Sequence, residues 1–335
     1  MQILENISLR PYNTFGIEAR ARYFASFKNN DELEELLAPG FQLPALLLGG
    51  GSNILLGGDI DGLVLKNDIR GITELHEDHE YVYVKAGAGE NWHQFVMYCI
   101  ERNWAGVENL SLIPGNAGAS PMQNIGAYAV ELQDVFFDLE AYHIKEKKIV
   151  RFTRNDCGFG YRESVFKGKY KDQFVILSVT YQLRKKPIFN TSYGAIEQEL
   201  EKIGVKELSI KAISEAVIRI RSSKLPDPAQ TGNAGSFFKN PLVSKEQFLQ
   251  LKAMFSTIIG HETHGAVKLA AGWLIEQCGW KGFRRGDAGC HAQQALVLVN
   301  YGNASGKEIY ELSKEILQSV KEKFGVVLER EVNII

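Results

Sequence analysis

The chain has 335 residues, of which 45% are hydrophobic and 23% are charged, as in an ordinary globular protein with enough material for a buried core. Its 38 basic and 40 acidic residues leave a net charge of −2, so no basic field is available to hold nucleic acid. No apolar run approaches the ~18 residues of a membrane-spanning helix and the first residues do not resemble a signal peptide, so we expect a cytoplasmic protein without nucleic-acid or membrane partners.

In the first half of the chain, short apolar runs alternate with glycine-rich turns. Residues 46–48 predict a strand just before three glycines, and residues 81–84 alternate as a strand does. A helix is predicted next, because its apolar residues recur at spacings of three and four. These residues are Trp92, Phe95, Val96, Cys99 and Ile100. Residues 174–183 are a β-branched and aromatic run that predicts a long strand.

The second half shows more helical periodicity. Ile210, Ile213, Val217 and Ile220 predict an amphipathic helix, and the prolines at 226 and 228 end it and indicate a domain boundary. Further helices are predicted near 244–254, 268–277 and 305–324, with strands at 295–299 and 326–328. The whole pattern predicts an α+β protein with a strand-rich first half and a helix-rich later domain.

Two glycine-rich segments are candidates for binding a phosphate. The first follows the strand at 46–48 and consists of Gly49, Gly50, Gly51, Ser52 and Asn53. Its backbone N–H groups could converge on a pyrophosphate, because no Cβ blocks the approach. A strand follows rather than a helix, so neither a Rossmann fingerprint nor a P-loop is present. The alternative is a glycine-rich hairpin. The second segment, 112–128, is too long for one turn, and loops of this length are usually functional.

A third segment, residues 232–241, presents Ser236 after a flexible Gly-Asn-Ala-Gly run and before two phenylalanines, a lysine and an asparagine. Such a backbone can approach a ligand closely, and the aromatic rings can exclude water. The alternative is a tight turn before a hydrophobic strand, because turns favour the same residues.

Two charged residues are further candidates. The fork of Arg162 suits a carboxylate or a developing oxyanion, and the alternative is a surface arginine. Glu331 lies in a predicted chain-terminal strand, whose alternation would put its side chain on the face opposite that of Val332. The alternative there is a solvent-facing glutamate.

Taken together and in order, the motifs resemble those of the UDP-N-acetylenolpyruvoylglucosamine reductase family over nearly the whole chain. They are Asn13–Gly16, Leu48–Asn53, Ile113–Gly115 with Gln123–Tyr128, Tyr161–Ser164, Arg221–Pro228, Gly235–Pro241 and Lys268–Cys278.

The resemblance implies a p-cresol-methylhydroxylase-like FAD-binding fold of two subdomains plus a C-terminal α+β substrate domain. The implied FAD-binding subdomains are 1–66 and 67–220, with an FAD-binding region of about 15–185 and a tyrosine loop near 187–200. A substrate-binding domain would span 221–320, and a return segment at 321–335 would carry Glu331.

The resemblance also implies site residues. The catalytic residues would be Ser236, Arg162 and Glu331. The residues near non-covalently bound FAD would be Gly49, Gly50, Gly51, Ser52, Asn53, Pro114, Gly115, Ser120, Asn124, Gly126 and Arg221. The substrate-binding residues would be Tyr193, Lys224, Asn240 and either Gln293 or Gln294. Two positions depart from the family's usual pattern, which has Arg where this chain has Asn333 and Gly where it has Ala129.

The implied reaction is the NADPH-dependent reduction of an enolpyruvyl ether to a lactyl ether in peptidoglycan precursor synthesis. Its small-molecule substrate would be the enolpyruvyl derivative of UDP-N-acetylglucosamine, reduced by a monomeric enzyme. Ser236 would act as a proton donor to a carbanion, with Arg162 and a protonated Glu331 stabilising the charge.

Two other functions are compatible with parts of the pattern. A related oxidase would tether its flavin through His or Cys, but neither residue lies in 49–56 or 113–128. A non-catalytic nucleotide-sugar-binding module would be colourless and would not consume NADPH. No metal site is expected, because the cysteines 99, 157, 278 and 290 contain no Cys-x-x-Cys pair.

Overall fold

The structure, a computed structural model, describes residues 2–38, 46–263 and 265–335. The chain divides into two compact units. Unit 1 consists of Met1–Ile7, Ala21–Gly50 and Ile60–Ser223, and unit 2 consists of Ser8–Arg20, Gly51–Asp59 and Lys224–Ile335. The sequential division at 66, 220 and 320 stays a prediction. Unit 2 also includes two short segments from the N-terminal part of the chain, which a division into consecutive domains would not assign to it.

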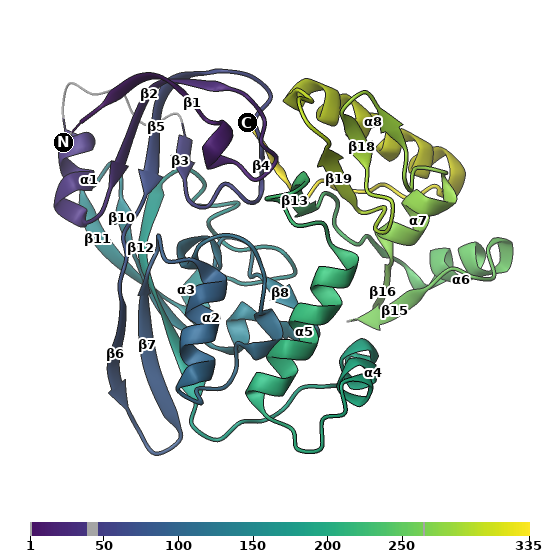
Figure 1. Ribbon diagram of the computed structural model, residues 1–335, viewed down its shortest axis with the longest axis horizontal. Coiled ribbons are helices and arrows are strands. Elements are labelled where there is room, and N and C mark those ends of the chain that lie inside the picture. Colours follow the sequence, from purple (N-terminus) through teal and green to yellow (C-terminus); the bar gives the residue numbers. More distant parts are fainter. Residues whose placement is uncertain (1, 39–45, 264) are drawn as a thin grey trace. The chain divides into compact units, whose positions relative to one another are not determined.

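Unit 1 contains two larger sheets (Figure 1). The first has the order β1-β2-β5-β3, in which β5 pairs in parallel with β2 and β3. The second is antiparallel, with the order β11-β10-β12-β7-β6. The strands are β1 (Leu4–Ser8), β2 (Arg20–Phe27), β3 (Leu46–Leu48), β5 (Ile60–Asn67), β6 (Ile72–Glu77), β7 (Tyr81–Gly87), β10 (Phe136–His143), β11 (Lys148–Thr153) and β12 (Phe174–Arg184), with a small pair, β8 (Gly126–Ala127) and β9 (Val130–Glu131).

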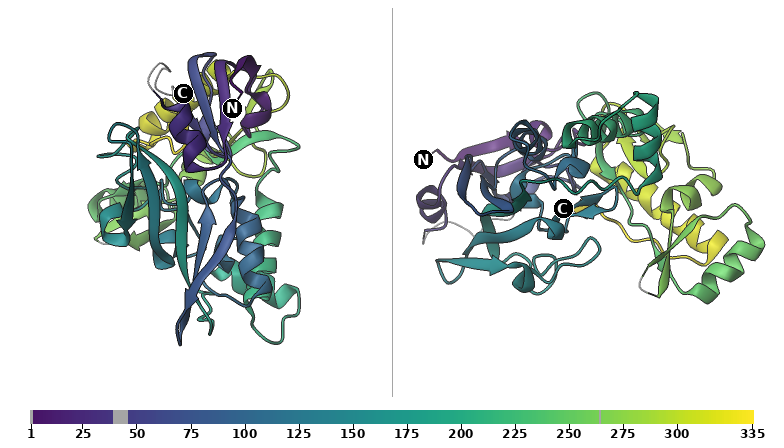
Figure 2. Two further views of the ribbon diagram at one scale, coloured as in Figure 1. Left: turned by 90° about the vertical axis from the view of Figure 1, so that its left-hand side faces the viewer. Right: turned by 90° about the horizontal axis from the view of Figure 1, so that it is seen from below.

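The alternation of β12 places apolar side chains on both faces of the antiparallel sheet. Val175 and Leu177 belong to one buried cluster, which includes residues of β2, β5 and α1. Ile176 belongs to another, together with the buried face of α2 and the start of α5. The sheet is therefore covered on both sides, and the side view in Figure 2 shows α2 and α5 on the same side of it. The helices of unit 1 are α1 (Asn30–Leu36), α2 (Trp92–Glu101), α3 (Arg154–Cys157), α4 (Gly194–Lys202) and α5 (Ile210–Lys224), with short 3-10 turns η2 (Glu108–Leu110), η3 (Ala117–Ala119) and η4 (Leu132–Asp134).

Unit 2 is built on a four-stranded sheet, β13-β19-β18-β17, and a three-stranded sheet, β14-β16-β15. Its elements are η1 (Arg10–Tyr12), β4 (Ile54–Leu55), β13 (Gly232–Ser236), β14 (Leu242–Val243), α6 (Lys245–Met254), β15 (Gly260–Thr263), β16 (Ala266–Leu269), α7 (Ala271–Gln277), β17 (Arg284–Arg285), β18 (Ala288–Cys290), β19 (Val297–Asn300), α8 (Gly306–Phe324) and β20 (Asn333–Ile334). Among the described residues, no helix is both long and apolar enough to cross a membrane.

The helix α8 follows the sequence prediction closely. Ser305 and Glu308 form a capping box at its start, and Gly325 ends it with φ +64°. Its predicted apolar face is buried, and burial of each such side chain contributes about 1.5–3 kcal/mol. The helices α2, α5 and α6 also lie where their spacing predicts.

Three predictions for the second half are wrong. The helix expected at 268–277 begins only at Ala271, because Lys268 and Leu269 belong to β16 and pair with β14 and β15. Residues 326–328 lie outside the strands, although Val326 and Leu328 are buried and Val327 is exposed. The second half is also richer in strands than expected, because strands of two to five residues carry little periodicity.

Candidate active site

The glycine loop at 49–53 connects β3 to β4, and at two of its positions a side chain would lie too close to neighbouring atoms. A Cβ on Gly50 would lie 2.9 Å from Asn116 Oδ1 and 3.0 Å from the Cα of Gly115. Gly51 has φ +63°, and a Cβ there would lie 2.0 Å from the carbonyl oxygen of Tyr12. Within unit 1, Gly50 therefore brings the first glycine segment against the second, at Gly115. This close backbone approach fits a ligand that is bound by main-chain N–H groups.

The second glycine segment is held in a strained conformation. Leu112, Asn124 and Tyr128, with Ala129 directly after the segment, all have φ between +45° and +62°, a region that non-glycine residues rarely occupy. Such residues cluster at functional sites, where the surroundings hold them in place.

Two of the predicted FAD-binding side chains have partners inside the protein. The amide nitrogen of Asn124 donates to Glu131 (2.8 Å) and to the carbonyl of Gly160 (3.2 Å), and its oxygen accepts from the N–H of Gln133. Ser120 is buried and donates to the carbonyl of Ala117, 2.6 Å away. Both side chains thus hold the loop in shape.

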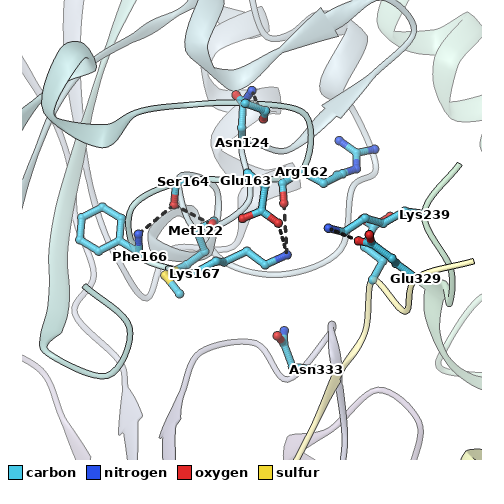
Figure 3. Close-up of polar contacts among 12 residues, drawn as sticks. Met122, Asn124, Arg162, Glu163, Ser164, Phe166, Lys167, Lys239, Glu329 and Asn333 are labelled. Carbon is cyan, nitrogen blue, oxygen red and sulfur yellow. Dashed lines mark hydrogen bonds and ion pairs between the residues drawn. The ribbon is translucent and has the colours of Figure 1, made fainter. Parts of the chain in front are cut away.

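Arg162 lies in unit 1, at a left-handed position with φ +55°. Its Nη2 donates to the carbonyl of Gly126 (2.8 Å), and its own carbonyl accepts from Lys167 Nζ at 3.1 Å. Close by, Ser164 Oγ donates to the carbonyl of Met122 at 2.7 Å (Figure 3). These bonds fasten the arginine segment to the second glycine segment, so both predicted features meet within one unit.

A second arginine of unit 1 lies near this region. Arg221, on α5, donates through Nε to the carbonyl of Leu112 at 3.2 Å and interacts electrostatically with the side chain of Tyr128. Burial lowers the pKa of Arg221, and the charge of Arg162 lowers it further, although a guanidinium stays protonated in proteins. Two charged guanidinium groups that repel each other would be stabilised by an anionic ligand.

The aromatic partner of this arginine was missed by the sequence reasoning. Tyr128 interacts electrostatically with Arg221, and its ring packs edge-on against Tyr193, with 5.3 Å between the ring centroids. Tyr193 is exposed at the start of α4. Tyr128 ends the motif Gln123–Tyr128, but nothing in the sequence indicates its contacts.

Ser236 ends the strand β13, and its segment is a bulged strand rather than the tight turn that was the alternative. The pairing with β19 shifts register between Asn233 and Ser236. Gly235 has φ +70°, and its N–H donates to Asn233 Oδ1 at 2.9 Å. A bulge of this kind re-aims the side chain that follows it. Phe237 and Phe238 are fully buried, so they anchor the half-buried serine from the core.

Glu331 lies beside this strand within unit 2. Its N–H donates to the carbonyl of Phe237 at 2.9 Å, next to Ser236. The expectation that Glu331 is part of the terminal strand is wrong, because β20 begins two residues later. There Asn333 pairs with the glycine loop, since its N–H and side-chain nitrogen both donate to the carbonyl of Asn53, at 3.1 and 3.0 Å. Asn53 Nδ2 in turn reaches the carbonyl of Glu331 at 3.3 Å.

Lys239 is the nearest basic residue along the chain from Ser236. Its ammonium lies 3.2 Å from Glu329 Oε2 (Figure 3). The lysine side chain is only 15% exposed, whereas that of Glu329 is 71% exposed. The lysine side chain is thus largely buried, although an ion pair with an exposed partner contributes little to stability.

The remaining predicted substrate residues of unit 2 differ in their surroundings. Asn240 Oδ1 accepts from the N–H of Ala271 at 2.9 Å, at the start of α7. Lys224 is exposed at the end of α5. Gln293 is exposed, whereas Gln294 is half-buried and accepts from the N–H of Leu296 at 3.4 Å. Both glutamines stay candidates.

Comparison with known proteins identifies relatives of the whole chain. Residues 21–151 match the FAD binding domain family, and residues 227–335 match the C-terminal domain of UDP-N-acetylenolpyruvoylglucosamine reductase. Proteins named UDP-N-acetylenolpyruvoylglucosamine reductase from Flavobacterium johnsoniae and Amoebophilus asiaticus are 50% and 51% identical, with full coverage of both chains. One from Pseudomonas syringae pv. tomato is 49% identical and covers 100% of this chain and 99% of its own.

A solved structure supports the fold. The crystal structure of UDP-N-acetylenolpyruvylglucosamine reductase from Thermus caldophilus aligns with a TM-score of 0.70 at 23% identity, covering 100% of this chain and 99% of its own. The predicted fold class is therefore confirmed: a p-cresol-methylhydroxylase-like FAD-binding fold followed by a C-terminal α+β domain.

Proposed function

Because the chain belongs to the family of UDP-N-acetylenolpyruvoylglucosamine reductases, we propose that it reduces the enolpyruvyl ether of UDP-N-acetylglucosamine to the lactyl ether of UDP-N-acetylmuramate. NADPH is the reductant and FAD the bound cofactor. The observation that carries the function is the identity of about one half with reductases of this name over the full length of both chains. The step belongs to peptidoglycan precursor synthesis.

We infer that the glycine segments hold FAD. Gly49 to Asn53 would cradle the pyrophosphate, because the loop offers main-chain N–H groups, and Gly50 allows the second glycine segment to lie against it. Pro114, Gly115 and Gly126 would lie near the flavin ring, in a loop that Ser120 and Asn124 keep in shape. Arg221 would offset the negative charge of the cofactor.

The chemical problem that the residues must solve is a build-up of negative charge on the substrate. When bound, FAD would supply the hydride chemistry, with NADPH as the source of the hydride and the terminal vinyl carbon of the substrate as its acceptor. The adjacent carbon, conjugated to the carboxylate, then carries the electron pair of an enolate dianion. Arg162 would donate hydrogen bonds to the carboxylate oxygens where this charge accumulates. Its backbone is already fixed by Lys167 and its Nη2 by Gly126, so little reorganisation would be needed.

The proton for this carbanion would come from Ser236. Serine is a weak acid in water, but a carbanion is a far stronger base than the leaving groups that acids usually protonate. Lys239 could relay a proton to the hydroxyl. Glu331 would stabilise the dianion by hydrogen bonding, which requires its protonated form. The backbone bond from Glu331 to Phe237 supports a joint role for Glu331 and Ser236.

The substrate residues and the working state of the protein complete the proposal. Tyr193, Lys224, Asn240 and one of Gln293 or Gln294 would bind the nucleotide sugar, and the tyrosine would place the chain in the subclass that has a tyrosine loop. The enzyme would work as a monomer in the cytoplasm. Size-exclusion chromatography with light scattering tests the monomer, and a dimer at working concentration would overturn it.

The central experiment is a stopped-flow comparison of the wild-type enzyme with Ser236→Ala. Reduction of the flavin by NADPH should be nearly unchanged, whereas its reoxidation by the enolpyruvyl substrate should slow by about 10²–10⁴-fold, the usual contribution of a general acid. Ser256→Ala, an exposed serine of the same unit, is the matched control. If Ser236→Ala slowed both half-reactions equally, the role of Ser236 as proton donor would be wrong.

A further inference from the structure

The motif Asn13–Gly16 has no part in the mechanism, yet it contacts two segments that do. All of these contacts lie within unit 2. Asn13 is buried, and its amide closes a turn by donating to the carbonyls of Leu9 (2.8 Å) and Ile17 (3.0 Å) and accepting from the N–H of Ile17 (3.0 Å). The side chain of Asn13 thus fixes the backbone from which Thr14 projects.

Thr14 bonds to two distant segments of the chain through its N–H, its carbonyl and its hydroxyl. Its N–H donates to the carbonyl of Gly51 at 3.1 Å, and its carbonyl accepts from the N–H of Asn233 at 3.0 Å. Its hydroxyl lies 2.7 Å from the carbonyl of Asn233 and 3.4 Å from that of Gly51. A single residue therefore links the glycine loop to the serine strand.

Both partners of Thr14 act directly on proposed functional groups. Gly51 belongs to the loop that would hold FAD. Asn233 accepts the N–H of Gly235 on its side-chain oxygen, and this bond shapes the bulge from which Ser236 projects. The amide nitrogen of Asn233 is also occupied, by the carbonyls of Pro226 and Thr231. A displacement of Asn233 would therefore move Ser236, because the side chain of Asn233 bonds to Gly235, the residue before it.

We propose that Thr14 is a positioning residue that fixes the serine strand against the glycine loop, so that its hydroxyl governs how well Ser236 delivers its proton. This inference rests on the proposed function. Proton transfer is sensitive to small displacements, since a misplacement of about 1 Å costs on the order of 10²-fold in rate. A bond that holds the donor strand is therefore expected to affect the rate of one step more than the fold.

The surrounding contacts allow the hydroxyl to be removed without losing the fold. Asn300 Nδ2 donates to the carbonyl of Phe15 at 2.9 Å, and the rings of Phe15 and Phe237 pack edge-on, with 6.1 Å between their centroids. The two backbone bonds of Thr14 need no side chain. Thr14→Val keeps the shape and the β-branch but loses the donor, whereas Thr14→Ser keeps the donor.

The test measures both half-reactions of the FAD-loaded variants by stopped flow. For Thr14→Val, protonation and flavin reoxidation by the enolpyruvyl substrate should slow by about ten-fold, with flavin reduction by NADPH unchanged. A larger solvent deuterium isotope effect on reoxidation is also expected. Thr14→Ser should restore the rate to within about two-fold. FAD titrated into the apoprotein should bind Thr14→Val about five-fold more weakly, the effect of one net hydrogen bond.

Other outcomes would overturn the proposal. If the Thr14→Val enzyme has a lower melting temperature but wild-type rates in both half-reactions, Thr14 has a structural role only. Equal slowing of both half-reactions would lead to the same conclusion. If Thr14→Val does not fold, Thr14→Ala replaces it, with the same expected and contradicting results. Ser236→Ala is measured in parallel. Unchanged reoxidation in Ser236→Ala would reject the proposed role of the serine, whereas unchanged reoxidation in Thr14→Val alone would reject only the positioning.

Discussion

The two units hold their proposed functional groups by different means. In unit 1, Arg162 and Arg221 are fastened by bonds from their side chains to carbonyls of the second glycine segment, whose backbone is left-handed at several non-glycine residues. In unit 2, Ser236 and Glu331 are held by backbone bonds among segments far apart in the chain. Function in unit 1 should therefore be sensitive to side-chain charge and shape, and function in unit 2 to the bonds that fix its backbone, including those of the Thr14 hydroxyl and the Asn233 amide.

After Ser236→Ala, the largest effect on catalysis should come from Arg162 of unit 1. Arg162→Lys keeps the charge but loses the planar fork, which a point charge does not replace. We expect kcat to fall by about 10²–10³-fold, the usual cost of removing a donor to a developing oxyanion. Steady-state kinetics check this, with exposed Arg219→Lys from the same unit as control. A rise in KM at unchanged kcat would show that Arg162 only binds substrate and would remove the contrast between the units.

The three glycines of the first loop give a sharper comparison. Gly51→Ala places a Cβ 2.0 Å from the carbonyl oxygen of Tyr12 at φ +63°, so we expect it to destabilise unit 2 by at least about 2 kcal/mol. Gly50→Ala would place a Cβ 2.9 Å from Asn116 Oδ1 but without a positive φ, so it should destabilise the protein less. Gly49→Ala meets nothing within 4 Å and should lie within about 0.5 kcal/mol of wild type.

Thermal and denaturant unfolding of the three glycine variants would check this order. FAD titration of the same variants separates stability from binding, because Gly50→Ala should lower the affinity for FAD by more than its loss of stability explains. The alternative of a glycine-rich hairpin is already wrong, because β3 pairs with β5 and β4 with β20. Equal losses of stability at all three positions would mean that the close contacts of Gly50 and Gly51 do not determine the stability of the loop.

The same contrast explains what the sequence could predict. The helices α2 and α8 were predictable because their buried faces recur every three or four residues. The bulge before Ser236 and the bonds of Thr14 were not, because they join residues up to 219 positions apart and leave no local pattern. The left-handed backbone of Arg162 also has no signal in its residue type. The motifs therefore identified the candidate residues, and the structure supplied the contacts that hold them.

The smallest effect should come from a histidine in each unit. His93 of unit 1 accepts the N–H of Leu112 on Nδ1 at 3.1 Å. Burial lowers its pKa, and the nearby charge of Arg221 lowers it further, whereas burial alone lowers the pKa of His291 in unit 2. Below pH 6.5, the ordinary pKa of histidine, these histidines are protonated in the unfolded chain but stay neutral in the folded state. Stability should therefore fall as pH drops from about 6.5 toward the folded pKa.

His93→Gln keeps an acceptor for Leu112 but cannot be protonated, so the loss of stability below pH 6.5 should become shallower. Denaturant unfolding at a series of pH values measures this, with exposed His79→Gln as the control. His291→Gln removes a histidine whose pKa burial alone lowers. The contradicting result is that His291→Gln makes the dependence of stability on pH shallower while His93→Gln leaves it unchanged. The charge of Arg221 would then have no energetic consequence at His93, and the electrostatic account of unit 1 would be wrong.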